Sequence, residues 1–112
     1  ENYESTFEEK TFALNKVCIL AIRNIHRIEQ FWSILSSFML IHIAHRDLKL
    51  ALQGVEVLFH VLLELARLEC EGQQSNFRLV FNTVLEVVRS CQQERVHYAV
   101  LEGLIKIMQN HQ

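Results

Sequence analysis

The six histidines are the side chains of this sequence best suited to bind a metal ion or to move a proton. His42 and His45 stand three residues apart, a spacing at which two imidazoles on one helix could share a zinc ion. No cysteine or carboxylate follows at a matching helical spacing, so we expect both to be surface or hydrogen-bonded histidines. His60 lies inside the apolar run 58–62, where we expect a partly buried histidine rather than a general base.

Three cysteines are the next candidates for chemistry: Cys18, Cys70 and Cys91. Their number is odd and their spacing is far wider than a C-x-x-C motif. This pattern disfavours a disulfide framework and favours a reducing compartment. Cys18 has mostly apolar neighbours, so we expect it to be a small buried hydrophobic residue.

Catalytic motifs are missing from the sequence. No run matches a nucleophile elbow, a zinc-protease helix or a phosphate-binding glycine loop. The acidic pairs Glu8/Glu9 and Glu69/Glu71 are typical of helix ends. No nucleophile has both an adjacent base and an orienting group. We therefore predict a non-enzymatic protein without a metal or cofactor.

The composition indicates one folded, helical domain. The 112 residues are 50% hydrophobic and 21% charged, which excludes a disordered chain. The absence of proline and the three glycines disfavour an all-β fold, and the net charge of −2 disfavours a nucleic-acid partner. The longest charge-free stretch, 30–45, is shorter than the roughly 20 residues that span a bilayer. Because the sequence starts at Glu1 without a methionine or leader, we expect a fragment.

Apolar residues recur at helical spacing in five segments separated by short polar breaks. Asp47 is the expected N-cap of the third segment, and Gly72 is the expected left-handed C-cap after it. The second segment is apolar on most sides, so we expect it in the middle of a layer. The predicted helices cover 6–28, 30–44, 48–69, 77–90 and 94–108.

The sequence also matches itself when it is shifted by 46 residues. This shift places the second predicted helix on the fourth and the third on the fifth, and the first fits the third less well. Matching apolar positions include Phe31/Phe77, Ile34/Val80, Met39/Leu85, Ile41/Val87, Leu50/Val96, Val55/Leu101, Leu58/Leu104, Leu62/Met108, Phe12/Leu58 and Ile19/Leu65. A period of about 40–47 residues with two helices per unit is typical of HEAT and armadillo repeats.

We therefore predict an all-α, right-handed superhelical stack of HEAT/armadillo-like antiparallel hairpins. The single helical-repeat domain 1–112 would hold hairpin one at about 5–45, hairpin two at about 47–91 and the first helix of a third at about 94–109. Terminal repeats of such stacks need a polar outer face. We expect Val96, Val100, Leu104 and Ile107 to face a missing sixth helix, so the chain would be part of a longer solenoid.

One polar stripe is the candidate protein-binding surface. Arg78, Asn82, Glu86 and Arg89 follow one another at three-to-four-residue spacing, on a helix expected to line the concave face. The alternative is an ordinary solvated helix face with weak neighbouring pairs. Ser33, Ser36 and Ser37 occupy the corresponding side of the second helix, where they could admit a partner or allow close helix packing.

Two runs resemble a known family. The run 24–32, with Asn24, Arg27 and Trp32, resembles a stretch of the helical repeats in large Arf-GTPase exchange factors and in their relatives that lack the exchange domain. The run 50–58, with Gly54, resembles the helix that follows, although Ala51 stands where the family often has arginine. Arg78 and Leu79 do not continue into the family's catalytic glutamate motif, so the resemblance implies no exchange activity.

The residues that carry the resemblance also have structural interpretations. We expect Trp32 to anchor the packing between hairpins and Gly54 to permit a close helix crossing. Arg27 could bind the end of a preceding helix or be solvated.

The resemblance implies a regulatory scaffold segment of a large vesicle-trafficking protein. Its partner would be a small GTPase or another part of the same chain, and it would be cytoplasmic, reaching Golgi or endosomal membranes only through partners. Composition alone allows the alternative of a generic adaptor solenoid in a nuclear or cytoskeletal complex.

Overall fold

The computed structural model describes residues 7–44, 47–73 and 75–110, and the elements found there are all helical. Five α-helices and one 3-10 helix account for most of this part of the chain, so the prediction of an all-α fold is confirmed. In chain order they are α1 (Phe7–Arg23), η1 (Ile25–Gln30), α2 (Trp32–Ile43), α3 (Leu48–Cys70), α4 (Phe77–Ser90) and α5 (Glu94–Asn110).

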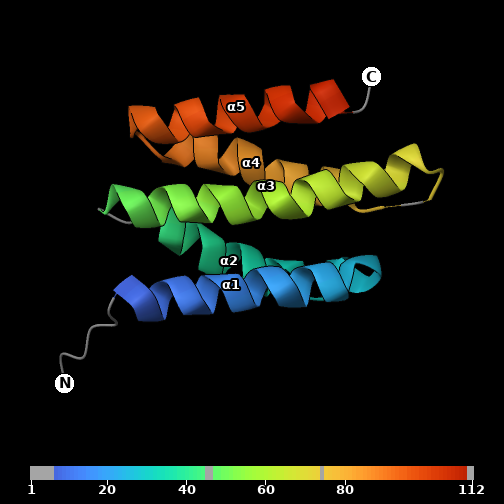
Figure 1. Cartoon of the computed structure of the whole chain (residues 1–112), viewed down its shortest axis with the longest axis horizontal. Coiled ribbons are helices and arrows are strands. Elements are labelled where there is room, and N and C mark those ends of the chain that lie inside the picture. Colours follow the sequence, from blue (N-terminus) through green and yellow to red (C-terminus); the bar gives the residue numbers. More distant parts are fainter. Residues whose placement is uncertain (1–6, 45–46, 74, 111–112) are drawn as a thin grey trace.

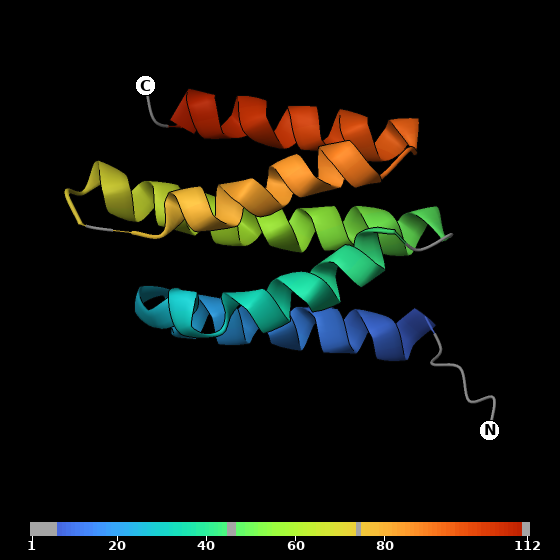
Figure 2. The ribbon, with the colours of Figure 1, turned by 180° about the vertical axis from the view of Figure 1, so that it is seen from behind.

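The helices form two layers (Figures 1 and 2). Helices α1, α3 and α5 run parallel to one another in the first layer, and α2 and α4 lie in the second. Helix α3 lies between α1 and α5 and also packs against α2 and α4. The molecule is elongated, with principal extents of 49 × 28 × 21 Å. The helices are therefore stacked side by side rather than wrapped around one central axis.

Helix α3 supplies more of the buried apolar core residues than any other helix, because its apolar residues cover several sides of the helix. Leu58, Val61, Leu62 and Leu65 are fully buried among its neighbours. The side chain of Asp47 accepts a hydrogen bond from the backbone N–H of Lys49 at 3.0 Å. The predicted N-cap is thereby confirmed.

The end of α3 also follows the prediction. Gly72 has a φ of +80°, the left-handed conformation that favours glycine. The backbone N–H of Gln73 donates to the carbonyl of Leu68, and that of Gly72 donates to the carbonyl of Glu69, each at 3.0 Å. These two bonds form a Schellman motif, so the predicted left-handed C-cap is confirmed.

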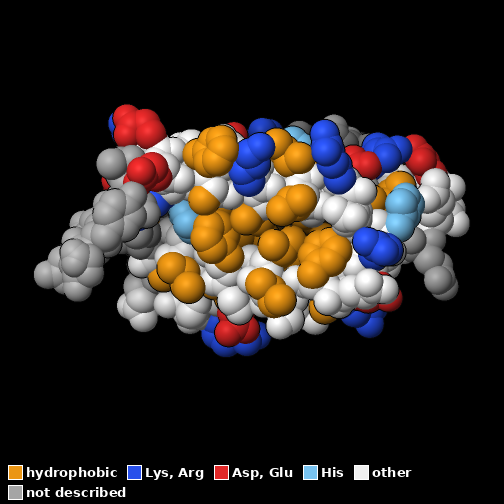
Figure 3. Space-filling model, turned by 90° about the horizontal axis from the view of Figure 1, so that it is seen from below, with side chains coloured by type: hydrophobic (Ala, Val, Ile, Leu, Met, Phe, Trp, Pro, Cys, Tyr) orange, Lys and Arg blue, Asp and Glu red, His pale blue; other side chains and the backbone are white. Residues whose placement is uncertain are grey.

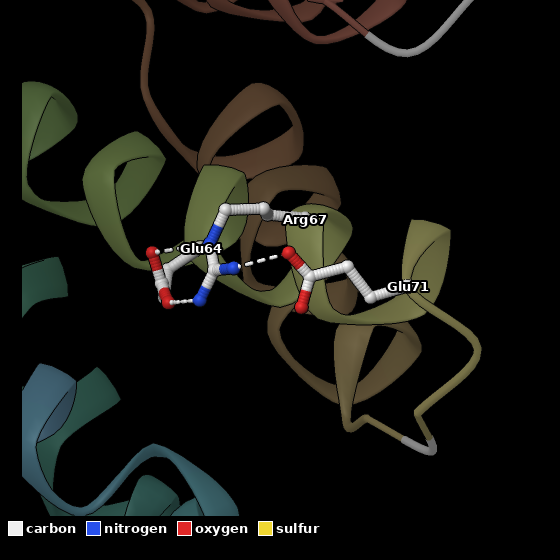
Figure 4. A network of polar contacts seen from close by, with 3 residues as sticks. All are labelled: Glu64, Arg67 and Glu71. Carbon is white, nitrogen blue, oxygen red and sulfur yellow. Dashed lines mark hydrogen bonds and ion pairs between the residues drawn. The ribbon is translucent and has the colours of Figure 1, made fainter.

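A small charge network lies near this end of α3 (Figure 4). The guanidinium of Arg67 donates hydrogen bonds to both carboxylate oxygens of Glu64 and to the carboxylate of Glu71. The hydrogen bond from Arg67 lowers the pKa of Glu64, and the bond to Glu64 raises the pKa of Arg67. Glu64 and Arg67 lie on the last turns of α3 and Glu71 is its C-cap residue, so the network stabilises that end locally.

The first predicted helix is wrong at its C-terminal end. Helix α1 ends at Arg23, where the side-chain Nδ2 of Asn24 donates to the carbonyl of Leu20 at 2.9 Å. A polar side chain that binds the backbone in this way competes with helix continuation. The 3-10 helix η1 follows, and Arg27 within it has non-helical dihedral angles. Ile25 and Ile28 are buried there, which explains why the apolar spacing resembled a continuing helix.

The second helix does not lie in the middle of a layer, so that prediction is wrong. Ile34 and Ile41 of α2 are 72% and 69% exposed. Helix α2 packs against α3 and α4 with one side only, and Trp32, Met39 and Ile43 are buried there. An apolar helix at the edge of the stack leaves its second apolar face uncovered.

The shift of 46 residues is right for α3 and α5. In the cleft between α1 and α3, the lining residues of α3 are Gln53, Glu56, Val57 and His60. In the cleft between α3 and α5, the lining residues of α5 are Ala99, Glu102, Gly103 and Lys106. Each residue of the second set lies 46 positions after one of the first set. The two helices therefore use equivalent faces against the helix before them.

The same shift is wrong for the other two helix pairs. The α1 residues Thr11, Leu14 and Cys18 correspond to Leu52, Val55 and Phe59 of α3, 41 positions later. The 46-residue match also pairs the exposed Ile34 with the buried Val80. A shift of 45 pairs Met39 with Val84 and His42 with Val87, which are all buried. The connections between helices differ in length, so no single shift describes the whole chain.

Candidate protein-binding surface

A groove separates α2 from α4 on the second layer of the molecule, and we call it the α2/α4 groove. It encloses about 330 Å³. Small serine side chains on α2 and polar side chains on α4 keep it open. The lining residues are Glu29, Trp32, Ser33, Ser36, Leu40, Leu79, Asn82, Thr83 and Glu86.

A buried tryptophan joins the two walls of the α2/α4 groove. Trp32 is 3% exposed, and its indole Nε1 donates a hydrogen bond to Oγ1 of Thr83 at 2.9 Å. Thr83 is also buried, so this bond satisfies two polar groups within the packing of α2 against α4. Trp32 therefore anchors the packing of α2 against α4, and its role between repeat hairpins stays a prediction.

The predicted polar stripe divides into two parts in the structure. Asn82 and Glu86 line the α2/α4 groove, whereas Arg78 and Arg89 are exposed on α4 outside its lining. Glu86 and Arg89 form a loose ion pair, with Oε1 and Nη1 separated by 3.9 Å. Two exposed cations on the same helix thus accompany a groove that carries the carboxylates of Glu29 and Glu86.

The serines of α2 are placed beside this groove. Ser33 and Ser36 line it, and Ser37 is exposed. The hydroxyls of Ser36 and Ser37 donate to the backbone carbonyl of Ser33, at 3.2 and 3.0 Å. The small side chains therefore leave a depression between α2 and α4. Whether a partner uses this space stays a prediction.

Of the remaining residues that carry the family resemblance, Gly54 has a clear packing role. An ideal Cβ on Gly54 would lie 2.7 Å from Cγ1 of Ile43, so glycine permits the close crossing of α2 and α3 that the sequence predicts. Asn24 caps the end of α1 through its bond to Leu20, and Arg27 is exposed on η1.

The histidines are arranged differently from the sequence expectation. His42 is 7% exposed, lies 4.7 Å from Phe38 between ring centroids, and has Nδ1 3.4 Å from the Phe38 carbonyl. His45 lies outside the described residues. His60 is exposed, so the prediction of partial burial is wrong; it lies on the outer face of α3, beside Glu56.

Metal-binding and thiol chemistry have little support in the described residues. Among residues 7–44, 47–73 and 75–110, no three His, Cys, Asp or Glu side chains are grouped so that they could hold a metal ion. Cys18 is half-buried in the cleft between α1 and α3, less deeply than predicted. Its burial raises the pKa of the thiol, which disfavours the reactive thiolate.

Both edges of the stack expose apolar side chains. At one edge, Figure 3 shows hydrophobic side chains gathered on the face that contains α1, and the exposed residues of α1 and α2 are Phe12, Ile19, Leu20, Ile34 and Ile41. At the other edge, Tyr98, Leu101, Ile105 and Met108 of α5 are exposed, and we call these four the α5 stripe.

The prediction of which apolar face of α5 is uncovered is wrong. Val96 and Val100, predicted to face a sixth helix, are buried in the core, and Leu104 and Ile107 are half-buried against it. The uncovered residues are those of the α5 stripe, whose three- and four-residue spacing is equally helical. The spacing of these four residues indicates a second apolar face in the sequence. The position of α3 decides which of the two faces is covered.

Two further findings concern membrane-spanning helices and similarity to known proteins. Within the described part of the chain, no helix combines the length and the apolar character that crossing a bilayer requires. The chain matches no protein-family model, no curated protein and no solved structure.

Proposed function

We propose that this chain is a non-catalytic protein-interaction scaffold, built as a right-handed stack of HEAT- or armadillo-like hairpins. The observation that carries the proposal is the α2/α4 groove, which lies between the second helices of the two proposed hairpins. Concave layers of stacked hairpins are the usual binding surfaces of helical-repeat proteins. The equivalent faces of α3 and α5, 46 residues apart, support the repeat assignment.

The proposed ligand is an extended segment of a protein partner. The groove offers hydroxyl and amide groups from Ser33, Ser36 and Asn82, beside the apolar side chains of Leu40 and Leu79. Such mixed linings bind a peptide through hydrogen bonds and apolar contacts together. The groove is lined by the carboxylates of Glu29 and Glu86, so acidic residues of the partner would be favoured only outside the groove, beside Arg78 and Arg89, which are exposed on the same helix.

We further propose that the scaffold belongs to a large vesicle-trafficking protein related to Arf exchange factors. The resemblance of runs 24–32 and 50–58 supports this assignment, and the packing of Trp32 and Gly54 is compatible with it. The partner would be a small GTPase or another part of the same chain. Association with Golgi or endosomal membranes would be peripheral and would occur through partners. The alternative is an adaptor in a nuclear or cytoskeletal complex.

The experiment is a pull-down with the 112-residue chain, read by mass spectrometry, followed by binding measurements with the captured protein. Ser36→Phe should fill the groove, and the double change Arg78→Glu and Arg89→Glu should repel an acidic partner. Both should weaken binding while the melting temperature stays unchanged. Arg95→Glu, an exposed arginine on α5, is the matched control.

Two outcomes would contradict the proposed site. Binding that survives both sets of changes would place the partner elsewhere, and a large drop in melting temperature for the arginine variant would show a structural role. The identity of the captured proteins separates the trafficking assignment from the adaptor alternative.

A further inference from the structure

The α2/α4 groove has an uneven distribution of charge. The described residues that line it include two carboxylates, of Glu29 and Glu86, and no lysine, arginine or histidine. Both glutamates are exposed. Nη1 of Arg89 lies 3.9 Å from Oε1 of Glu86, which is too far for a hydrogen bond, and both side chains are more than half exposed. The interior of the groove is therefore negatively charged.

The two carboxylates lie towards opposite ends of the groove. Helices α2 and α4 run in the same direction on its two sides (Figure 2). Oε1 of Glu29 accepts a hydrogen bond from Nδ2 of Asn76 at 2.8 Å, which holds Glu29 beside the start of α4. Glu86 follows ten positions after Asn76, or about 15 Å further along the helix at 1.5 Å per residue. A ligand that meets both carboxylates must therefore lie along the groove.

A buried hydroxyl between the two carboxylates supplies a third contact. Thr83 lines the groove, is 7% exposed, and accepts a hydrogen bond from the indole Nε1 of Trp32 at 2.9 Å. An indole N–H only donates, so this bond occupies a lone pair of Oγ1 and leaves the hydroxyl proton for an acceptor. The main-chain carbonyl of an extended segment is such an acceptor.

We propose that the α2/α4 groove binds an extended segment of a partner protein that carries two basic residues, lysine or arginine, four positions apart. This inference rests on the proposed function of the groove and specifies the chemistry of its ligand. Four residues of extended chain cover about 13 Å, and residues four positions apart point to the same side. The two basic side chains would meet Glu29 and Glu86, and a carbonyl between them would accept from Thr83. An uncharged residue between them would contact Leu40 and Leu79.

A second copy of this chain does not offer such a segment. Among the lysines and arginines of the sequence, only Arg23 and Arg27 stand four positions apart. Arg23 is the last residue of α1 and Arg27 belongs to η1, so this pair is not part of an extended segment. The first six residues contain two glutamates and no basic residue. The chemistry of the groove thus favours a segment of another protein.

The test uses the fluorescence of Trp32, the only tryptophan of the chain, as a reporter inside the groove. The probe is a nine-residue peptide of serine with arginine at its third and seventh positions and valine at its fifth. One control peptide has glutamate in place of both arginines. Another has its second arginine at the sixth position, where it points to the opposite side. We expect the probe to bind about threefold more tightly than the second control and the glutamate peptide not to bind. Added salt should weaken binding of the probe.

Variants of the 112-residue chain locate the contacts. Glu29→Gln and Glu86→Gln should each weaken binding of the probe about two- to fivefold, the usual effect of one exposed ion pair. Glu102→Gln, at an exposed position of α5, is the matched control that should leave binding unchanged. The double change Glu29→Lys and Glu86→Lys should reverse the preference, so that the glutamate peptide binds and the probe does not. Melting curves of each variant check that the fold is intact.

Several results would overturn the proposal: absent binding, equal affinity of the probe and the glutamate peptide, or binding that neither glutamine variant weakens. Binding of the probe that survives Ser36→Phe would place the peptide outside the groove and would also overturn it. Self-association of the chain that is seen by light scattering and lost in Glu86→Gln would identify a second copy as the occupant, with the same consequence.

Failure of this inference is distinguishable from failure of the proposed function. A captured protein whose binding is weakened by Ser36→Phe, but not by Glu29→Gln or Glu86→Gln, would leave the groove as a binding surface and overturn only the basic ligand. A captured protein that binds Ser36→Phe as tightly as the unchanged chain would contradict the groove itself.

Discussion

Gly103 and Phe59 lie so close that the Cγ, Cδ1 and Cε1 atoms of the ring stand 2.6 to 2.7 Å from the place of an ideal Cβ on the glycine. Phe59 is buried, so its ring cannot move into solvent without losing core contacts. Any side chain at position 103 must push α5 away from α3.

We expect Gly103→Leu to lower the free energy of unfolding by about 1–3 kcal/mol, the usual cost of overpacking. Urea denaturation measures the change. In a double-mutant cycle with Phe59→Leu, the two costs should not add, because the smaller side chain relieves the overlap. Additive costs would show that Gly103 and Phe59 do not compete for the same space.

Trp32 is the second site where packing between helices can be measured, here between α2 and α4. Trp32→Ala removes a buried side chain and its bond to Thr83, and it should destabilise the fold by about 3–5 kcal/mol. Thr83→Val leaves the indole N–H without this acceptor and should cost about 1–3 kcal/mol, whereas Thr83→Ser keeps a hydroxyl and serves as its control. An unaltered denaturation midpoint for Trp32→Ala would contradict the burial of this side chain.

Substitution of Gly72 tests how the left-handed backbone conformation at the end of α3 affects stability, without any change in side-chain packing. Its φ is +80°, and no atom lies within 4 Å of the place where a Cβ would stand. Gly72→Ala should therefore destabilise the chain by about 1–2 kcal/mol through the strain of the left-handed conformation, with no steric clash. Gly72→Asn should cost less, because asparagine adopts this conformation more readily. Equal stability of all three proteins in thermal melts would argue against the left-handed cap.

The charge network of Glu64, Arg67 and Glu71 predicts that the stability of the fold depends on pH. The hydrogen bond from Arg67 lowers the pKa of Glu64 in the folded chain, so ionised Glu64 stabilises the fold above the ordinary glutamate pKa of about 4.3. This contribution is lost as the pH falls through the lowered, folded value. Glu64→Gln should reduce the melting temperature slightly at neutral pH and not at all in strong acid.

The control for this pH dependence is Glu102→Gln on the exposed surface of α5. It removes a carboxylate outside the Glu64–Arg67–Glu71 network. A deficit of Glu64→Gln that persists in strong acid would show that glutamine disturbs packing rather than charge. Added salt should weaken the effect, because the arginine and both carboxylates are partly exposed.

The sequence predicted α3, α4 and α5 closely because their ends carry recognisable signals. Asp47 and Gly72 mark the ends of α3, and α4 has the predicted bounds Phe77–Ser90. The end of α1 was not predictable in the same way, because Ile25 and Ile28 keep helical spacing while their backbone forms a 3-10 helix. Local apolar spacing does not distinguish an α-helix from a 3-10 helix when either one would bury the same side chains.

The edges of the stack were harder to predict for a different reason. Helix α5 has two apolar faces, one with Val96 and Val100 and one with Leu101 and Ile105. Spacing alone makes both suitable for burial, and only the position of α3 selects the first. The α2/α4 groove likewise depends on how closely two helices approach, which the types of Ser33 and Ser36 suggest but do not determine.

The position of α3 between α1 and α5 has a mechanical consequence. Each outer helix is held mainly by its neighbour, so tension applied to the two ends of the chain would detach helices from the edges before it reached the centre. The central helix would be the last to yield. We therefore expect such a chain to lengthen in steps under load rather than to rupture at once.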